Sequence, residues 1–409
     1  MRFDVIVVGA GPAGSTTARE CAERGLSVLL LDKAEFPRDK PCGGGITVRA
    51  LRLLPFSIES VVERVITDVY LTHKQGSGFS RRSDDHLVSM TQRRNFDMLL
   101  LEKALEAGVT LKERATVRHV SRDATSVDIS TDDETFTASV LVAADGANGK
   151  TAQMSGIEQN FWQQIALEGN ITPLGGMPEE WQTCFGLDVG SVPGGYGWVF
   201  PKGDHLNVGI GGWRYVGPGL RNSLNNLAKF HGFESENMWG LRGHYLTIRK
   251  PDSPLVDGNV ALVGDAAGLV DPMSDEGIYS SIWSGQTAAR NIADYIGGET
   301  ADLLNYKREI ESELVPELNI SLRFHDLFQL NPGLYMWAEK HTSLVWALAR
   351  RILRGDQTYV NVMLTHKATG NLIDFLSDLV RVTPFLQRRS GLRDPALPQR
   401  FFVRGNAQT

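Results

Sequence analysis

The chain has 409 residues, of which 42% are hydrophobic and 22% are charged, the proportions of a soluble globular protein with more than one module. The net charge of −6 argues against nucleic-acid binding, and no apolar run reaches the roughly 18 residues that span a bilayer. Cys21, Cys42 and Cys184 are too few and too widely spaced for a disulfide framework or a metal site, so we expect a reducing, cytoplasmic setting and no metal.

A glycine-rich turn joins the first expected strand to the first expected helix. Residues 3–8 form a nearly continuous apolar run, as in a parallel strand that helices cover on both faces. The turn that follows reads Gly9-Ala10-Gly11-Pro12-Ala13-Gly14. Gly9 permits the tight turn, Gly11 lets the backbone approach a pyrophosphate, and Gly14 allows close helix packing. Free N–H groups at the helix start, around Pro12 and Ala13, favour phosphates, so the pattern predicts a bound dinucleotide.

An acidic residue ends the second expected strand, residues 27–31. Asp32 lies 18 residues after Gly14, close to the position of a carboxylate that accepts the ribose hydroxyls, and Lys33 follows it. We expect both residues to bind the nucleotide. The alternative, a glycine turn without a ligand, does not explain the order of strand, helix, strand and acid.

Two later buried strands also end in glycine and acid. Residues 139–144 lead into Asp145-Gly146, and residues 260–263 lead into Gly264-Asp265. Ligands of open α/β sheets lie beyond the carboxyl ends of the strands. A nicotinamide cofactor needs only the first of the three segments, so a ligand that reaches all three is longer. The pattern therefore predicts FAD. An ionised Asp265 would accept hydrogen bonds from the sugar-alcohol chain, although its alternative role is a helix N-cap.

A long helix is expected from about residue 277 to 296. The loop before it contains Pro272, and Gly277 and Ile278 stand at its start. Its N-terminus would point at the flavin pyrimidine ring and favour the negative charge that develops there on reduction. We expect these three residues to contact the cofactor.

The fold class predicted is α/β, in three parts. A discontinuous Rossmann-like FAD-binding domain is expected from residues 1–64, 92–155 and 250–300. Alternating and aromatic-rich segments predict a mostly antiparallel β-sheet substrate domain from residues 65–91 and 156–249, interleaved with the first. Residues 301–409 are expected to form a helical C-terminal region.

These motifs resemble the geranylgeranyl reductase family of FAD-dependent oxidoreductases, within the p-hydroxybenzoate-hydroxylase-like superfamily. The resemblance covers roughly residues 1–300. Beyond the three glycine and acid segments, its motifs are R-x-x-F-D at Arg93, K-P-C-G-G at residues 40–44, Y-x-W-x-F-P-K-G at residues 196–203 and E-G-I-Y at residues 276–279. One departure is Asp275, where glycine is common in the family. The resemblance implies that Arg93, Cys42, Gly43 and Gly44 lie at the flavin.

The implied reaction saturates isolated C=C bonds of an isoprenoid, or polyprenyl, substrate in lipid biosynthesis. Reduced flavin delivers a hydride to one carbon and a proton reaches the other, so the site must exclude water and position the alkene. Cys42 is a candidate proton donor, with bound water as the other. Tyr196, Trp198 and Phe200 share one strand face and could line the prenyl channel, or simply pack the sheet. Lys202 could meet a diphosphate or lie in solvent.

Other functions share this scaffold. A flavin monooxygenase or halogenase would consume oxygen, and halogenases carry W-x-W-x-I-P where this chain keeps Trp198 but has Tyr196. A flavin quinone reductase or electron-transfer protein is a second alternative, and a non-enzymatic prenyl-binding escort protein is a third. No second glycine fingerprint is present, so the external reductant is expected to be a transiently bound NAD(P)H, such as NADPH, or ferredoxin.

The C-terminal end is basic. Residues 340–409 hold eleven Lys/Arg and four Asp/Glu, a net charge of +7 within an acidic chain. Such a segment favours peripheral contact with anionic lipid on the inner face of the membrane, or is an ordinary solvated helical surface. No signal peptide is expected before the first strand.

Overall fold

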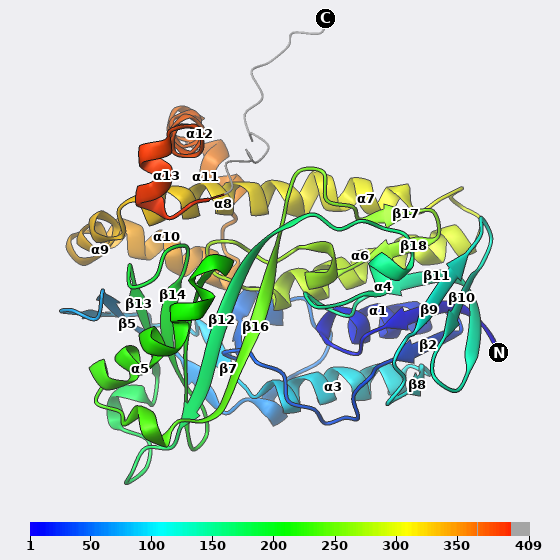
Figure 1. Cartoon of the computed structure of the whole chain (residues 1–409), viewed down its shortest axis with the longest axis horizontal. Helices are drawn as coiled ribbons and strands as arrows, with labels where there is room; N and C mark the ends of the chain where they lie inside the picture. The colour runs from blue at the N-terminus through cyan, green and yellow to red at the C-terminus, as the bar shows by residue number, and fades with distance from the viewer. Residues whose placement is uncertain (366, 394–409) are drawn as a thin grey trace, which may run out of the picture.

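The computed structural model describes residues 1–365 and 367–393. An eight-stranded sheet in the order β17-β18-β11-β1-β2-β8, with β10 paired to β11 and β9 to β10, occupies one half of the molecule (Figure 1). Its strands are β1 (Arg2–Val8), β2 (Val28–Leu31), β8 (Thr110–Lys112), β9 (His119–Arg122), β10 (Val127–Ser130), β11 (Thr135–Ala143), β17 (Val256–Asp257) and β18 (Val260–Leu262).

The register of this sheet positions the cofactor motifs. Val8 of β1 pairs in parallel with Leu31 of β2 and with Ala143 of β11, and Ala143 pairs with Leu262 of β18. The carboxyl ends of four strands therefore meet at one edge, together with the three glycine and acid segments that follow them. Apolar side chains bury these strands on both faces, which explains their near-continuous hydrophobic runs.

Helices cover the eight-stranded sheet. Helix α1 (Pro12–Glu23) packs against both α6 (Ile278–Ile296) and α3 (Arg93–Glu106). Gly285 of α6 allows the close approach, because a Cβ there would lie 2.8 Å from the Ala13 carbonyl oxygen of α1. Two further helices are short: α2 (Val48–Leu51) begins directly after β3 (Gly45–Thr47), and α4 (Thr151–Met154) follows the loop after β11.

The second half is a seven-stranded sheet in the order β16-β12-β15-β14-β13-β5-β6. All its pairs are antiparallel except β13 with β5. Helix α5 (Leu220–Phe230) packs its leucines on one face of the sheet. The strands are β5 (Asp68–His73), β6 (Phe79–Arg82), β12 (Phe161–Ile171), β13 (Cys184–Val189), β14 (Tyr196–Pro201), β15 (Leu206–Trp213) and β16 (Trp239–Arg249).

A small third sheet was not expected. It joins β3 (Gly45–Thr47), β7 (Val88–Met90) and β4 (Arg64–Ile66), all antiparallel. The expected boundary between residues 64 and 65 falls inside β4, and β3 and β7 lie in segments assigned to different domains. The partners of strands this short are difficult to predict from the sequence, because the paired residues lie far apart in the chain.

The C-terminal region is helical over its described residues and lies above the seven-stranded sheet in Figure 1. The expected region 301–409 includes residues 366 and 394–409, which lie outside the described part of the chain. Its elements are α7 (Leu304–Glu309), a π-helical turn (Ile310–Leu314), α8 (Val315–Leu330), α9 (Pro332–His341), α10 (Ser343–Arg354), α11 (Tyr359–Thr365), α12 (Lys367–Val382) and α13 (Pro384–Ser390).

Buried ion pairs hold the last helices in place. The Arg381 guanidinium of α12 contacts Asp326 of α8 at 2.6 Å, and Arg323 of α8 contacts Asp378 of α12 at 2.8 Å. Both arginines are fully buried, so each requires the opposite charge beside it. Among the described helices, none combines the length and the apolar character that crossing a membrane requires.

Candidate functional site

A cavity of about 1560 Å³ lies between the two large sheets and the C-terminal helices. It exceeds the usual range for a single small-molecule pocket, which is about 300–1,000 Å³. Its lining comes from the glycine-rich turn, the loop at residues 38–45, strands β12, β14 and β16, the segment before α6, and helices α8 to α10. One space therefore connects the edge of the eight-stranded sheet with the helical region.

The glycine-rich turn forms one end of the cavity. A Cβ on Gly14 would lie 1.7 Å from the Gly9 carbonyl oxygen, and Gly9 itself has a φ of +102°. The fold itself therefore requires glycine at both positions. A Cβ on Gly11 would meet only the Arg38 guanidinium, at 3.5 Å, so the free space above Gly11 is available to a ligand. Pro12 and Ala13 line the cavity beside it, whereas Gly14 does not.

Asp32 and Lys33 also line this end of the cavity. The Asp32 carboxylate is buried and accepts hydrogen bonds from the backbone N–H of Ala10 and of Ala34, each at 2.8 Å. Each carboxylate oxygen has a further lone pair, which leaves capacity for a ribose hydroxyl.

Asp145 stabilises the loop that leads into α4. Its Oδ2 accepts hydrogen bonds from the backbone N–H groups of Lys150 and Thr151 and from the Thr151 hydroxyl, at 2.7–2.9 Å. The carboxylate therefore caps the start of α4 and shapes the loop around Gly146, which has a φ of +77°. Both residues line the cavity.

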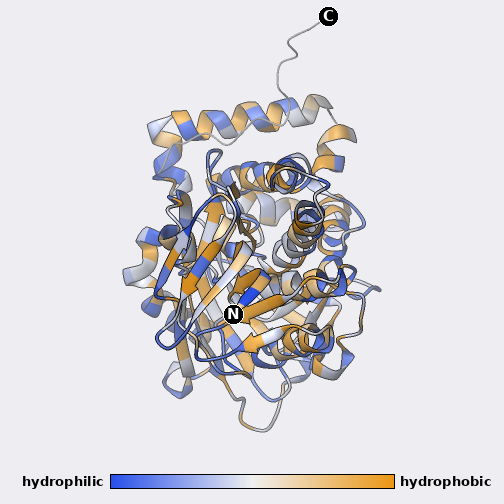
Figure 2. Ribbon diagram, turned by 90° about the vertical axis from the view of Figure 1, so that its right-hand side faces the viewer, coloured by the Kyte–Doolittle hydropathy of each residue, from blue (hydrophilic) through white to orange (hydrophobic). Residues whose placement is uncertain are grey.

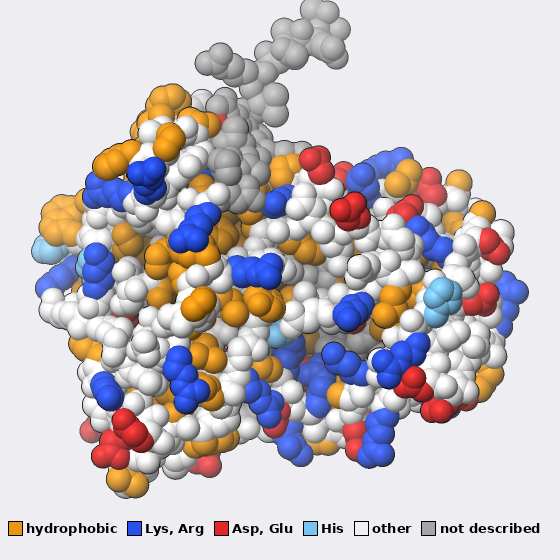
Figure 3. Space-filling model, in the orientation of Figure 1, with side chains coloured by type: hydrophobic (Ala, Val, Ile, Leu, Met, Phe, Trp, Pro, Cys, Tyr) orange, Lys and Arg blue, Asp and Glu red, His pale blue; other side chains and the backbone are white. Residues whose placement is uncertain are grey.

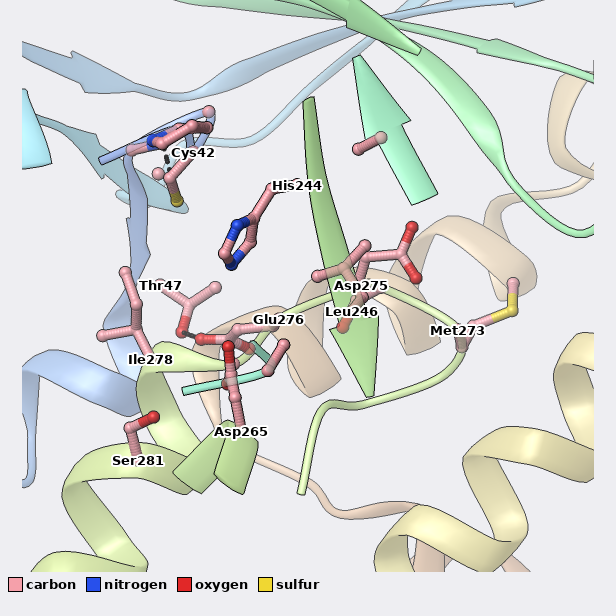
Figure 4. Close-up of a pocket in the computed structure, with 18 of the residues that line it drawn as sticks. Cys42, Thr47, His244, Leu246, Asp265, Met273, Asp275, Glu276, Ile278 and Ser281 are labelled. Atoms are coloured by element: carbon pink, nitrogen blue, oxygen red, sulfur yellow. Dashed lines mark hydrogen bonds between the residues drawn. The ribbon is translucent and has the colours of Figure 1, made fainter. Parts of the chain in front are cut away.

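Asp265 lies over the start of α6 (Figure 4). A Cβ on Gly277, the N-cap of α6, would meet its Oδ1 at 2.8 Å, and the Lys40 ammonium lies 3.9 Å from its Oδ2. Gly277 and Ile278 line the cavity with it. Gly264 instead packs against Ser281 and Ala13 with a φ of +58°, and Pro272 is buried outside the lining.

The loop with Cys42 is held by long-range contacts. The Cys42 backbone N–H donates to Glu168 of β12 at 2.8 Å, and the Gly44 N–H donates to Cys42 Sγ at 3.3 Å. A Cβ on Gly43 would collide with the Phe200 ring at 2.6 Å. Arg93 lines the cavity beside this loop and pairs with the buried Asp97 at 2.6 Å.

Lys202 takes neither of the roles considered for it, because it is 3% exposed and faces the loop. Its Nζ donates to the carbonyl oxygens of Gly43 and Thr91, the second at 3.0 Å. A lysine that lies 159 positions after Gly43 in the sequence thus fixes the backbone of the glycine loop. No pattern in the sequence predicts this contact.

Lys202 gives a pH prediction. Burial lowers its pKa to about 8, whereas the ordinary value is 10.5. Between these pH values the unfolded chain binds a proton that the folded chain does not, so the stability of the wild type relative to Lys202→Met is expected to rise with pH from about 8 to about 10. Urea unfolding of both proteins on either side of pH 8 measures this difference. Lys229→Met, at an exposed lysine, is the control, and a difference that stays constant or falls would contradict the prediction.

The three aromatic residues of β14 share one face and line the cavity. The ring centroids of Tyr196 and Trp198 are 6.2 Å apart, as are those of Trp198 and Phe200. The Tyr196 hydroxyl donates to the Ser274 carbonyl oxygen and the Trp198 Nε1 donates to Asn207 Oδ1, both at 2.7 Å. Fixed polar edges leave the ring faces as a rigid apolar wall.

Several polar cavity residues were not singled out from the sequence, among them Glu168 and His244. Glu168 is the loop acceptor described above. His244 of β16 lines the cavity, and its Nε2 has no hydrogen-bond partner in the described part of the chain. Burial lowers the pKa of His244 to about 4. Asp275 was noted only as a departure from glycine, and its φ of +56° explains why glycine is common there.

Comparison with known proteins gives the family. Residues 2–173 match the FAD binding domain family model. A geranylgeranyl diphosphate reductase of Rhodobacter capsulatus is 30% identical over 313 residues, covering 74% of this chain and 78% of that protein. A digeranylgeranylglycerophospholipid reductase of Methanopyrus kandleri is 30% identical over 356 residues, covering 78% and 92%. The chain belongs to the geranylgeranyl reductase family. A menaquinone reductase of Mycolicibacterium smegmatis is also similar, at 31% identity over 319 residues, covering 70% and 76%.

Solved structures agree with this geranylgeranyl reductase fold. A geranylgeranyl bacteriochlorophyll reductase-like protein of Thermoplasma acidophilum superimposes with a TM-score of 0.73 at 24% identity, covering 80% of this chain and 87% of that one. A flavin-dependent brominase superimposes with a TM-score of 0.69 at 20% identity, covering 87% and 94%. Both likenesses concern the fold, and the halogenase alternative is the less close fit.

The cavity of this geranylgeranyl reductase family member fits FAD. The space above Gly11 would take the pyrophosphate at the N-terminus of α1, and Asp32 retains acceptor capacity for the ribose. The Asp265 carboxylate, whose charged neighbour Lys40 stands 3.9 Å away, is an acceptor for hydroxyl donors of the ligand. The protein is an FAD-dependent oxidoreductase.

Proposed function

We propose that this protein reduces isolated C=C bonds of a polyprenyl lipid or diphosphate. The observation that carries the proposal is the continuity of the cavity from the Cys42 loop, past the aromatic wall of β14, into an apolar passage among the C-terminal helices. That passage is lined by Phe324, Leu327, Phe328, Leu334, Tyr335, Val345, Leu348, Ala349, Ile352 and Leu353. Burying prenyl carbons there is worth about 0.8 kcal/mol per CH₂.

We assign different roles to the cofactor and to the protein. FAD, once bound and reduced, supplies the hydride. The aromatic wall and the apolar passage hold the prenyl chain and exclude water, because an isolated alkene has no polar group by which a side chain could activate it. The Lys202 contacts keep the Cys42 loop rigid beside the reacting carbons. The relatives named above act on geranylgeranyl compounds or on menaquinone, which supports a polyprenyl substrate here.

Anaerobic reoxidation tests this function. Holoprotein reduced with dithionite is mixed with geranylgeranyl diphosphate, a geranylgeranylated glycerolipid or menaquinone. The masses of the products are then measured by mass spectrometry. We expect the flavin to reoxidise while the product gains one pair of hydrogen atoms per reduced double bond. Oxygen-dependent hydroxylation or halogenation, or reduction of a quinone ring with every double bond intact, would contradict the proposal. Supplying NADPH or reduced ferredoxin in place of dithionite identifies the reductant.

We further propose that α10, α12 and α13 rest on an anionic membrane surface. The ribbon of the molecule mixes hydrophobic and hydrophilic residues along its helices (Figure 2), and α10, α12 and α13 expose large apolar side chains beside arginines (Figure 3). The cavity reaches Leu376, Leu386 and Arg389 between α12 and α13. A prenyl lipid could then enter from the bilayer. The exposed apolar residues are Leu344, Leu372, Phe375, Leu376, Leu379, Val382 and Phe385, and the basic ones include Arg351, Arg388 and Arg389.

Vesicle binding measures this contact. The protein is expected to sediment with phosphatidylglycerol vesicles more than with phosphatidylcholine vesicles, and less at high salt, because the arginine contribution is screened. Phe375→Glu and Phe385→Glu should each reduce binding, since they place a negative charge on the apolar face. Leu174→Glu is the matched control, because Leu174 is 95% exposed but lies outside these helices. Equal binding to both vesicles by all variants would contradict the proposal.

A further inference from the structure

We propose that Asp275 is the acid that protonates the second carbon of the double bond, an inference that rests on the proposed function. Asp275 lies in the loop between Gly268 and α6, two residues before Gly277, and its side chain lines the cavity (Figure 4). One carboxylate oxygen, Oδ1, is buried and has no hydrogen-bond partner within residues 1–365 and 367–393. An unsatisfied buried carboxyl in a ligand cavity is costly unless a ligand or a proton satisfies it.

The backbone holds this side chain in a strained but fixed position. Asp275 has a φ of +56°, a left-handed conformation that costs a non-glycine residue about 1 kcal/mol. Its N–H donates to the Asp271 carbonyl oxygen at 2.9 Å, while Asp271 Oδ1 accepts from the N–H groups of Met273 and Ser274, each at 3.0 Å. Tyr196 fixes the same loop through the Ser274 carbonyl. Strain that the surrounding structure maintains is common at functional sites.

The charges nearby separate Asp275 from the other two carboxylates of the loop. Glu276 pairs with the Arg49 guanidinium at 2.5 Å, and Asp271 lies 3.6 Å from the same guanidinium. Glu276 also accepts from the Thr47 hydroxyl at 2.6 Å, and Asp271 from the Ser321 hydroxyl at 2.7 Å. For Asp275 the structure gives no cationic partner in the described residues. The Arg49 guanidinium is therefore shared by Glu276 and Asp271, and Asp275 is the carboxyl of this loop without a counter-charge in the described residues.

Burial first, and then the charge of Asp271, raise the pKa of Asp275 well above its ordinary value, which favours the neutral carboxyl over the carboxylate. The facing phenol of Tyr196 also stays neutral, because burial raises its pKa. A carboxyl that is protonated at working pH can donate its proton once, and regain it from water after turnover.

The step balances with groups already named. One alkene carbon forms a C–H bond with the hydride that reduced FAD supplies, and the neighbouring carbon forms a C–H bond with the proton from the Asp275 carboxyl. The C=C π bond breaks, the flavin is oxidised by two electrons, the alkene is reduced by the same two electrons, and the Asp275 carboxylate is reprotonated by water. Cys42 is the competing donor, but its Sγ accepts the Gly44 N–H, and Figure 4 shows it on a different side of the pocket from Asp275.

Variants at residue 275 test the proposal. Asp275→Asn keeps the shape and removes the acid, and Asp275→Gly suits the left-handed backbone. Both should retain FAD and lose about 100-fold or more in kcat, with little change in KM. The wild-type rate should fall as pH rises through the pKa of Asp275, and this limb should disappear in the Asn variant. Cys42→Ser should keep this pH dependence, whatever its effect on the rate.

A second readout does not require turnover. Infrared difference spectra of wild-type and Asp275→Asn holoprotein at neutral pH should contain the C=O stretch of one protonated carboxyl, and Asp133→Asn, at an exposed turn, should not change that band. If the band is present but no polyprenyl compound is reduced, the proposed function fails and the donor role fails with it. If double bonds are reduced but the Asn variant keeps the wild-type kcat and pH limb, or the band is missing, Asp275 is not the donor. Loss of the limb in Cys42→Ser instead would assign the proton to Cys42.

Discussion

Gly14→Ala is expected to lose both bound FAD and the stable packing of α1 on β1. The added Cβ would lie 1.7 Å from the Gly9 carbonyl oxygen and 3.2 Å from the Ala144 side chain. Overpacking of this kind typically costs about 1–3 kcal/mol and occasionally more. The nearest atom is backbone, so relief requires the helix to move, which displaces the N–H groups that would bind the pyrophosphate. Thermal unfolding and the flavin absorbance of the purified protein measure the two effects.

Gly11→Ala is the matched control, because it adds the same methyl group without a clash against the backbone. Its Cβ would meet only Arg38, at 3.5 Å. The apo form of this variant should unfold at the wild-type temperature, while its FAD affinity falls because the methyl group occupies ligand space. A Gly14→Ala protein with wild-type unfolding temperature and full flavin content would show that the turn is not packed as described.

Asp265→Ala is expected to purify with little or no flavin. Hydrogen bonds to a charged acceptor are worth about 1.5–3 kcal/mol each, so the loss of this carboxylate should weaken FAD binding at least tenfold and more if two hydroxyls contact it. The Lys40 ammonium, 3.9 Å from Asp265, would also lose an opposite charge; burial already lowers the pKa of Lys40. Flavin content and a titration of the apoprotein with FAD measure the effect.

Two comparisons make the Asp265 result specific. Asp265→Asn keeps an acceptor oxygen without the charge, so its FAD affinity should lie between those of the wild type and the alanine variant. Asp133→Ala removes an exposed carboxylate and should bind FAD normally. An Asp265→Ala protein with full yellow colour would contradict the assignment of this residue to the cofactor.

Local patterns were sufficient for much of the cofactor end. Strand, glycine turn, helix and acid lie within one short segment, and their conformations depend on neighbouring residues, so β1, α1, β2 and the approximate bounds of α6 could be predicted. The convergence of Asp32, Asp145 and Asp265 was also predictable, because the carboxyl ends of parallel strands lie at one edge of a sheet. Alternation placed the aromatic residues of β14 on one face.

The sequence by itself determined the α/β class, the family motifs and the cofactor, because these depend on short-range spacing and on the regular geometry of parallel strands. Only the tertiary structure decided which polar groups are satisfied. In the folded chain, Lys202 points inward and donates to the glycine loop, and Asp145 accepts hydrogen bonds at the start of α4. Arg49 pairs with Glu276 and Asp271 but not with Asp275. The partners in the Lys202 and Arg49 contacts are more than a hundred positions apart, and burial and pairing at such distances follow from packing that no local pattern records.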